Sequence, residues 1–210
     1  MRLCCAAYAV LLALAACGSS SAASGARADG ARSASCGPPG ARTLAASHHA
    51  RVYALGGEVY GCAVGSARHY RLGASRRTLR EGRVGPVAVA GRDAAYAISS
   101  FGVDTVSAQV IVRNLATGRR LRHAPATSRV MVESFQTVDS VVVKADGAVA
   151  WISAEESVVS PSRYLEVHRI DARGRAVLDS GSGIGGRSLA LHRSTLSWRD
   201  GASTRSATLR

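Results

Sequence analysis

A glycine-rich motif near the end of the chain is the first candidate for chemistry. Residues 181–186 read GSGIGG and match the pattern G-x-G-x-x-G. In dinucleotide-binding proteins this pattern joins a strand to a helix, and the N-terminus of the helix faces the phosphates. Here residues 188–191, which follow the motif, have the composition of a strand. We therefore interpret the motif as a loop between strands and expect no dinucleotide cofactor.

Two pairs of titratable residues are the next candidates. Glu155 and Glu156 could supply two carboxylates, and His48 and His49 could supply two imidazole ligands. Neighbouring side chains of an extended strand point to opposite faces, so neither pair can converge there on one substrate or one metal ion. We expect the two glutamates in a solvated loop and the two histidines in a hairpin turn. His168 lies within a predicted strand and is either a surface cross-strand partner or a member of a site.

The rest of the sequence contains no recognisable catalytic motif. It has no Asp-x-Asp calcium loop, no cysteines at metal-binding spacing and no nucleophile elbow around a serine. Most aspartates occupy predicted turns, where the carboxylate bonds to the local backbone. We therefore predict no catalytic residue, no metal and no cofactor.

The first 16 residues have the features of an export signal. Arg2 provides a basic start, and residues 3–16 form an apolar and small-residue run that is too short to span a bilayer as a helix. The run ends Leu-Ala-Ala followed by Cys17, which resembles the lipobox of bacterial lipoproteins. The resemblance implies that Cys17 is diacylated and becomes the mature N-terminus. The alternative is a signal peptide cleaved after Ala15, which would release a secreted, soluble protein.

The remaining cysteines indicate a disulfide. Once the cysteines of the signal and Cys17 are set aside, Cys36 and Cys62 remain as an even pair in an exported protein. A bond between them would fasten the incoming chain to the domain. Residues 18–35 consist mostly of Gly, Ala and Ser, which favours a flexible tether. The predicted organisation is a signal peptide (1–16), a lipidated cysteine with its tether (17–35) and one domain (36–210).

The chain is strongly basic, with a formal net charge of +13, and Lys144 is its only lysine. One interpretation is a polyanion-binding face, because arginine pairs bidentately with phosphates and carboxylates. The other is a GC-rich genome, which favours Ala, Gly and Arg codons together. The arginines are scattered and rarely alternate with aromatics, which favours the second interpretation and argues against nucleic acid. The charge would still attract anionic surfaces at low salt.

A ten-residue unit occurs four times in the domain. Its clearest copy, residues 142–151, reads VVKADGAVAW, in which two β-prone runs flank a turn at Asp146 and Gly147. The other copies are residues 44–53, 87–96 and 189–198. Each copy closes on an aromatic residue, and we expect these four to be core residues: Tyr53, Tyr96, Trp151 and Trp198. A second apolar anchor follows the first three at a constant offset of 19: Leu72, Leu115 and Ile170.

Short apolar runs that alternate with turns, at a period of roughly 45 residues, predict an all-β domain. The Thr-Gly turn after Leu115 and the Arg-Gly turn after Asp171 resemble the junction between third and fourth strands in bacterial YVTN-like and PQQ-like propeller repeats. This resemblance covers residues 42–209 and implies a β-propeller-like array of about four antiparallel blades in an actinobacterial-type secreted lipoprotein. The chain lacks the WD40, kelch and full PQQ signatures, so no cofactor is implied.

The fourth unit ends one strand short. We expect residues 35–40 to close the array by pairing with residues 202–209. The alternative is an open or sandwich-like β domain built from the same hairpins.

The sequence therefore predicts a non-enzymatic binding or scaffold lipoprotein on the outer face of the cytoplasmic membrane. Its expected partners are the membrane, through the lipid on Cys17, and an anionic cell-envelope polymer or a protein, with no nucleic acid. The alternative is an enzyme or enzyme accessory that acts on anionic extracellular glycans. Clustered Asp, Glu or His in one pocket would favour the enzyme, whereas a Ser, Thr and apolar lining would favour the binder.

Overall fold

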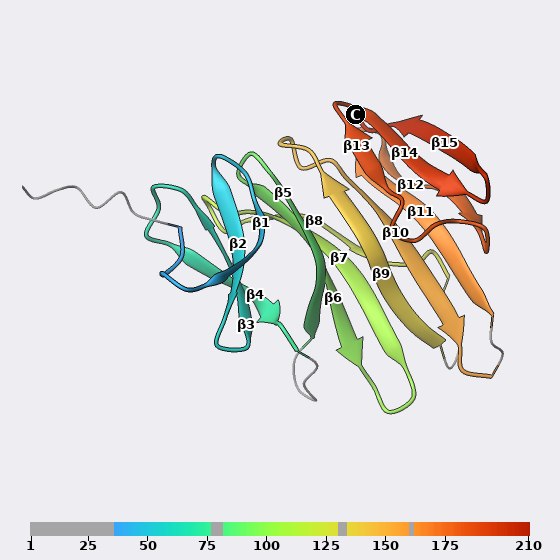
Figure 1. Cartoon of the computed structure of the whole chain (residues 1–210), viewed down its shortest axis with the longest axis horizontal. Coiled ribbons are helices and arrows are strands. Elements are labelled where there is room, and N and C mark those ends of the chain that lie inside the picture. Colours follow the sequence, from blue (N-terminus) through green and yellow to red (C-terminus); the bar gives the residue numbers. More distant parts are fainter. Residues whose placement is uncertain (1–35, 77–81, 130–133, 160–161) are drawn as a thin grey trace, which may run out of the picture. The chain divides into compact units, whose positions relative to one another are not determined.

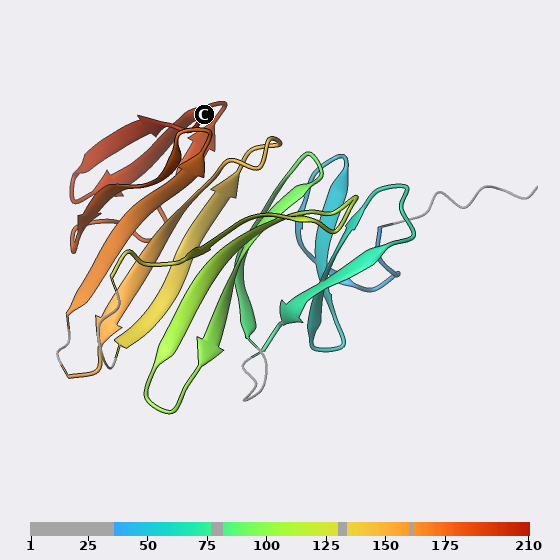
Figure 2. The same ribbon diagram turned by 180° about the vertical axis from the view of Figure 1, so that it is seen from behind.

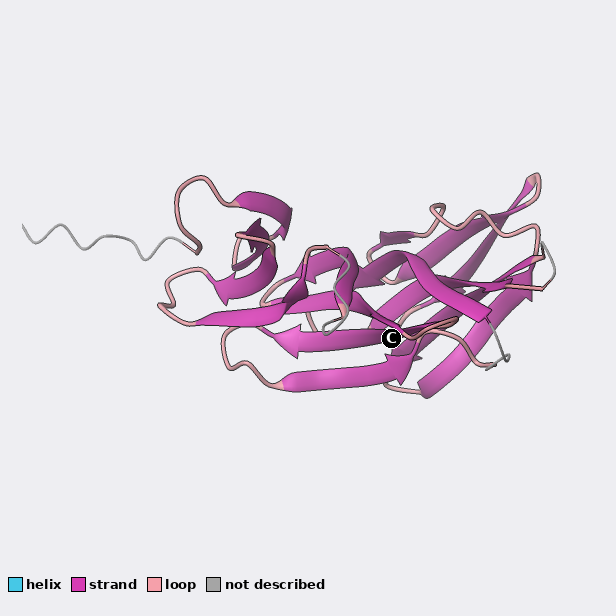
Figure 3. Ribbon diagram, turned by 90° about the horizontal axis from the view of Figure 1, so that it is seen from below, coloured by secondary structure: helices cyan, strands magenta, loops and turns pink. Residues whose placement is uncertain are grey.

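The computed structural model describes residues 36–76, 82–129, 134–159 and 162–210. The expected signal peptide (1–16), Cys17 and the expected tether (17–35) lie outside the described residues. The described chain forms 15 strands in two sheets, one of 12 strands and one of three (Figure 1). These strands are the only regular structure that it contains, which confirms the expected all-β class (Figure 3). Among the described residues, no helix could therefore cross a membrane.

The 12-stranded sheet consists of three successive antiparallel meanders. Meander 1 contains β1 (Arg42–Ala46), β2 (Ala50–Leu55), β3 (Glu58–Ala63) and β4 (His69–Ala74). Meander 2 contains β5 (Arg83–Ala90), β6 (Asp93–Phe101), β7 (Val106–Asn114) and β8 (Arg120–Pro125). Meander 3 contains β9 (Ser134–Val143), β10 (Val149–Ser157), β11 (Arg163–Asp171) and β12 (Gly174–Gly181). The separate small sheet contains β13 (Ala190–His192), β14 (Thr195–Asp200) and β15 (Ser203–Thr208).

A single parallel residue pair joins each meander to the next. Ala74 in β4 pairs with Arg83 in β5, and Val106 in β7 pairs with Phe135 in β9. Both pairs lie close to a turn between the second and the third strand of a meander. The β2–β3, β6–β7 and β10–β11 hairpins therefore all lie along the same edge of the array (Figures 1 and 2). We call it the hairpin end.

The predicted turn at Asp146 and Gly147 is confirmed between β9 and β10. Gly147 has a φ of 78°, a left-handed conformation that glycine adopts without steric cost. The Ala148 backbone N–H donates to the Asp146 carboxylate at 2.9 Å, and this bond is the main reason why the pKa of Asp146 is lowered. The turn places β10 in the middle of meander 3, where every residue from Val149 to Glu155 is buried.

Three apolar clusters fill the spaces between successive meanders and between meander 3 and the small sheet. One joins meanders 1 and 2, the second joins meanders 2 and 3, and the third joins meander 3 to the small sheet. The second strands of meander 2, meander 3 and the small sheet each contribute a buried aromatic to the cluster shared with the preceding meander: Tyr96, Trp151 and Trp198. A four-stranded meander cannot cover both of its faces by itself, so these contacts are what bury the apolar residues.

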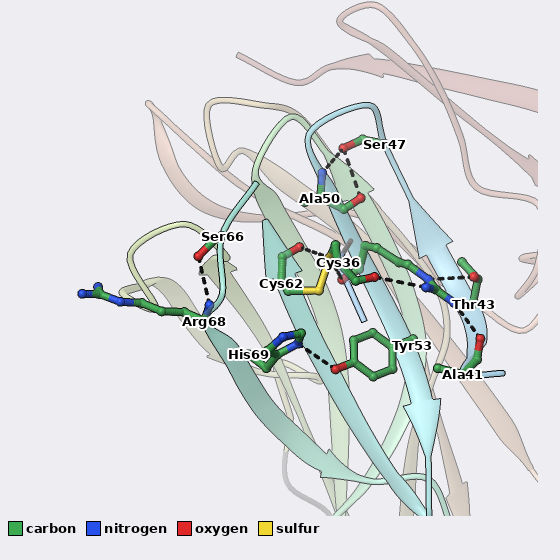
Figure 4. The surroundings of a disulfide bond; sticks show 11 residues. Cys36, Ala41, Thr43, Ser47, Ala50, Tyr53, Cys62, Ser66, Arg68 and His69 are labelled. Carbon is green, nitrogen blue, oxygen red and sulfur yellow. Dashed lines mark hydrogen bonds between the residues drawn. A yellow bond between two sulfur atoms is a disulfide. The ribbon is translucent and has the colours of Figure 1, made fainter. Parts of the chain in front are cut away.

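Tyr53, the aromatic of meander 1, has no preceding meander to pack against. Instead it is buried with Ala41 and with the disulfide between Cys36 and Cys62, whose Cα atoms are 5.5 Å apart. The disulfide predicted from the sequence is confirmed. Arg51 donates hydrogen bonds to the carbonyl oxygens of Cys36 and Ala41, at 3.1 and 2.6 Å (Figure 4). Residues 36–41 thus form a cap over the free face of meander 1.

The small sheet lies at the other end of the row of meanders from the cap, and its outer face carries polar side chains. Alternate residues of β14 and β15 face away from the apolar cluster, and they are small or hydrophilic: Thr195, Ser197, Arg199, Thr204, Ser206 and Thr208. A polar outer face is what keeps a terminal repeat soluble.

The expected closure of the array is wrong for the described residues. Residues 36–40 form no strand, and β15 pairs only with β14 in the described part of the chain. The prediction that the last unit is one strand short is confirmed, since the small sheet has three strands where each meander has four. The disulfide explains the difference, because it holds the incoming segment on meander 1.

The constant offset of 19 residues does not mark equivalent positions. Leu72 lies in β4, Leu115 follows β7, and Ile170 lies in β11. Loop lengths differ between the meanders, so equal spacing along the chain gives unequal places in the fold. Leu115 nevertheless packs between meanders 1 and 2, where the absence of a side chain at Gly61 makes room for it.

We predict that replacing both disulfide cysteines, Cys36→Ser and Cys62→Ser, lowers the free energy of unfolding by roughly 3 kcal/mol, because the bond closes a 26-residue separation. The loss should be measured by urea denaturation. The cap should also loosen, so Tyr53 should become accessible to chemical modification. An unchanged free energy and a protected Tyr53 would contradict the role of the cap.

Candidate functional site

A cleft of about 620 Å³ lies along the first strands of the three meanders. β5 is adjacent to both β1 and β9, so residues that are far apart in the sequence meet there. The uncharged lining of the cleft includes apolar and hydroxyl side chains: Leu44, Val59, Val84, Pro86, Ala97, Val138, Ser75, Ser99 and Thr137. The charged lining consists of four arginines and two carboxylates: Arg42, Arg83, Arg163, Arg187, Asp139 and Glu156. The net charge of the lining is therefore +2.

Arg163 forms ion pairs with both of the carboxylates named above. Its guanidinium lies 2.5 Å from the Asp139 carboxylate and 3.0 Å from the Glu156 carboxylate. Among the described residues, the other three arginines have no carboxylate partner and no hydrogen bond from the guanidinium: Arg42, Arg83 and Arg187. All three are exposed. Their charges are therefore available to a ligand.

The loop that follows β12 brings Arg187 to the cleft. This loop is the GSGIGG motif, and no helix follows it, which confirms its interpretation as a loop between strands. Ser140 in β9 donates a hydrogen bond to the carbonyl oxygen of Gly186 at 2.8 Å. A Cβ atom at Gly186 would collide with the Asp139 carboxylate, so only glycine allows this approach. The last glycine of the motif thus allows the loop to pack closely against β9.

The two adjacent glutamates lie in a strand, and the expectation of a solvated loop for them is wrong. Both belong to β10, where Glu155 is buried and Glu156 is exposed. They do point to opposite faces, as extended backbone requires. Glu155 accepts a hydrogen bond from the Ser134 hydroxyl at 2.8 Å, whereas Glu156 faces the cleft. Pairing with β9 and β11 on either side keeps this segment extended.

His168 is fully buried in β11, so it is no surface residue. Its ring stacks on Trp151 across the β10–β11 pair, with centroids 4.8 Å apart and planes 8° from parallel. His168 Nε2 lies 2.9 Å from a carboxylate oxygen of Glu166, to which it donates, and Nδ1 has no hydrogen-bond partner among the described residues. Ser128 donates to the same carboxylate through its backbone N–H, at 2.7 Å, and through its hydroxyl.

This cluster lacks the geometry of a catalytic triad. The carboxylate of Glu166 lies between the serine and the histidine, so the imidazole cannot accept the proton of Ser128. Its effect is to fasten the segment that leaves β8. Trp151 Nε1 donates to the Ala126 carbonyl oxygen at 2.7 Å, and Arg175 donates to two further carbonyl oxygens of residues 125 and 127.

Burial and hydrogen bonding set the charge states of the pair. Burial by itself would raise the pKa of Glu166, but hydrogen bonds from His168 and Ser128 outweigh it and lower the pKa to about 2. Burial lowers the pKa of His168, although Glu166 opposes the shift. The carboxylate is therefore ionised and the imidazole neutral at physiological pH.

The remaining candidates do not assemble into a site. His48 and His49 are exposed in the β1–β2 turn, as expected. Asp171 accepts hydrogen bonds from the backbone N–H groups of Arg173 and Arg210, and these and its arginine contacts lower its pKa although burial opposes the shift. It thus organises the Arg-Gly turn. Within the described ranges, no three His, Cys, Asp or Glu side chains are grouped to hold a metal ion.

Sequence reasoning missed the charged residues of the cleft. A charged residue lies 11 to 13 positions before each closing aromatic: Arg42 before Tyr53, Arg83 before Tyr96, Asp139 before Trp151 and Arg187 before Trp198. All four line the cleft. This spacing is the signal that could have found them, because it places these positions on the first strand of each meander or, for Arg187, just before the first strand of the small sheet.

No protein-family model matches the chain, and a search of curated proteins found no match.

We predict that acidification destabilises the fold in two stages. Both pKa values are lower in the fold than in the unfolded chain, so stabilisation is complete above the unfolded values and is lost as the pH falls. The neutral His168 ring loses its contribution below pH 6.5, and the Glu166 carboxylate loses its contribution between pH 4.5 and about 2.

The variant Glu166→Gln separates these effects. It should lose about 1–3 kcal/mol of unfolding free energy at pH 7, since the charged acceptor is gone, and its acid limb below pH 4.5 should be flatter than in the wild type. Urea denaturation at a series of pH values measures both changes. The exposed Asp104→Asn is the matched control. A parallel acid limb in Glu166→Gln would refute the assignment.

Proposed function

We propose that the protein is an exported, lipid-anchored binding module without catalytic activity, and that its cleft holds an anionic ligand outside the cytoplasmic membrane. The observation that carries this proposal is the convergence of three unpaired, exposed arginines on one cleft: Arg42, Arg83 and Arg187. They come from meanders 1 and 2 and from the loop before the small sheet. Planar guanidinium groups pair bidentately with phosphates and carboxylates, so the ligand class is anionic.

The lining of the cleft supports a binder over an enzyme. Within the described part of the chain, two carboxylates line it, Asp139 and Glu156, and both contact Arg163. A general acid in a glycan-cleaving site must be free to give its proton to the substrate, whereas both of these carboxylates form ion pairs with one guanidinium, at 2.5 and 3.0 Å. The rest of the lining is hydroxyl and apolar, which is typical of a binding surface.

We also infer that the three meanders and the small sheet are blades of a propeller-like array that is left open. Three observations support this inference. The three meanders have the same strand order, and each of them, like the small sheet, has a buried aromatic on its second strand. The first strands of the meanders also lie side by side along the cleft. The cap and the polar face of the small sheet would then replace the missing neighbours.

The cleft proposal is tested by removing its free charges. The triple variant Arg42→Ser, Arg83→Ser and Arg187→Ser should bind inorganic polyphosphate about 10- to 100-fold more weakly than the wild type, because each arginine near an anionic surface contributes on the order of 1 kcal/mol. Calorimetric titration at fixed salt measures the dissociation constants.

The control for this test is a charge-matched triple variant outside the cleft. Arg119, Arg122 and Arg199 are exposed and line no part of the cleft, so their replacement by serine removes the same net charge. It should leave the dissociation constant nearly unchanged. Equal weakening in both triple variants would mean that net charge alone attracts the polyanion, and the cleft would lose its role.

The lipid anchor is tested separately. The wild-type protein should incorporate labelled palmitate and partition into detergent, because the sequence before Cys17 resembles a lipobox. Cys17→Ala should abolish both properties, whereas Cys36→Ser should abolish neither. Labelling that persists in Cys17→Ala would remove the anchor from the proposed function.

A further inference from the structure

Most of the exposed large hydrophobic side chains in the described part of the chain lie at the hairpin end. Seven large hydrophobic residues are exposed in the described part of the chain: Leu55, Val64, Val103, Phe135, Val158, Val159 and Val177. Five of them lie at the hairpin end, all of these except Val64 and Val177. Val103 is 96% exposed and Val159 is 79% exposed. Single exposed apolar residues are ordinary on protein surfaces. Exposed apolar residues gathered at three separate hairpins on the same edge instead indicate an interaction surface.

The strand pairing fixes this common placement. Leu55 ends β2 and Phe135 lies at the start of β9, next to the end of β10. Val103 lies in the β6–β7 hairpin, and Val158 and Val159 follow β10. The view in Figure 1 shows these hairpins projecting on the same side of the array.

The arginines of the cleft lie at the same end. Arg42 pairs with Ala54, Arg83 pairs with Ser99, and Arg163 pairs with Glu156, each beside a hairpin. Arg76 borders a smaller hollow next to Leu55, and Arg187 is one of the residues that line the cleft. The five apolar residues and these five arginines together form what we call the hairpin rim.

Acidic side chains at the hairpin rim do not cancel this charge. Asp104 is exposed beside Val103, and Asp139 and Glu156 contact Arg163. Glu58 at the start of β3 pairs with Arg71 at 2.9 Å, which is a neutral pair. Among the described residues, the five arginines of the rim against these three carboxylates (Asp104, Asp139 and Glu156) leave a net charge of +2.

We propose that the hairpin rim docks on the surface of a bilayer that contains anionic phospholipid, with headgroup phosphates in the arginine cleft and the apolar tips in the interface. The proposal names the ligand of the proposed cleft and therefore rests on the proposed function. Aliphatic tips flanked by arginines are the composition of interfacial membrane-binding surfaces, where apolar burial and attraction to anionic lipid act together. A polymer bound from water would use the arginines but would leave the tips exposed.

The test places an environment-sensitive nitrobenzoxadiazole label at single cysteines in the full-length protein. Val103→Cys and Val159→Cys report on the rim, and Val64→Cys is the matched control, since it is 56% exposed and lies at the opposite end of β3. The protein is added to vesicles of phosphatidylcholine alone or of phosphatidylcholine with phosphatidylglycerol.

The rim labels should shift to shorter wavelength and brighten severalfold only with phosphatidylglycerol, and high salt should reverse the change because exposed charges are screened. The Val64 label should not respond. Equal responses at all three positions, or none at the rim, would overturn the proposal.

The arginine variants separate this inference from the cleft itself. Arg42→Ser, Arg83→Ser and Arg187→Ser together should abolish the response at Val103, whereas the charge-matched variant of Arg119, Arg122 and Arg199 should keep it. Polyphosphate binding without a rim response to vesicles would show that the cleft takes a soluble polyanion, which overturns the membrane proposal alone. A wild-type protein that binds neither probe would overturn the proposed function as well.

Discussion

The packing of a buried aromatic side chain from meander 2, meander 3 and the small sheet against the meander before it is the contact on which the rest of the structure depends. Each meander is only four strands wide, and its two faces are both apolar, so it is stable only when a neighbour covers them. Trp151 illustrates the scale: it is fully buried, and truncation of a buried aromatic residue typically costs about 3–5 kcal/mol, a large share of the stability of a small domain. The single parallel pairs between meanders are too few to hold the array together without this packing.

This arrangement makes the two ends of the array a physical problem, and the chain solves each in a different way. The aromatic of meander 1 has no preceding sheet, so a disulfide-bonded segment covers Tyr53. The last sheet has no following neighbour, and Ser, Thr and Arg side chains make its outer face hydrophilic. A closed ring would need neither device. The cap and the polar outer face therefore both fit an array that is open. The first strands of the meanders remain together on one side, where they line the cleft.

Local signals were enough to predict the all-β class, the Asp146–Gly147 turn and the disulfide, because each depends on neighbouring residues or on cysteine number. The burial of Glu155 could not be predicted, since it depends on a partner hydroxyl from Ser134 that only strand pairing supplies. Closure was predicted from a missing strand, but a count of strands says nothing about where the N-terminal segment is held. The cleft was missed because its residues are separated by about a repeat and meet only when the first strands align.

The charges of the cleft follow the repeat, and this relation constrains what the cleft can bind. The position 11 to 13 residues before the closing aromatic carries arginine in three units and Asp139 in the third. Asp139 holds Arg163, a residue from a later strand, and so converts a negative position into part of a basic surface. Gly186 gives the Asp139 carboxylate the space that it needs and fixes the approach of the loop that carries Arg187. The third unit and the loop thus depend on each other. The positive charge therefore rests on the alignment of all four units, so a ligand that neutralises it also favours the packed array over its separated sheets.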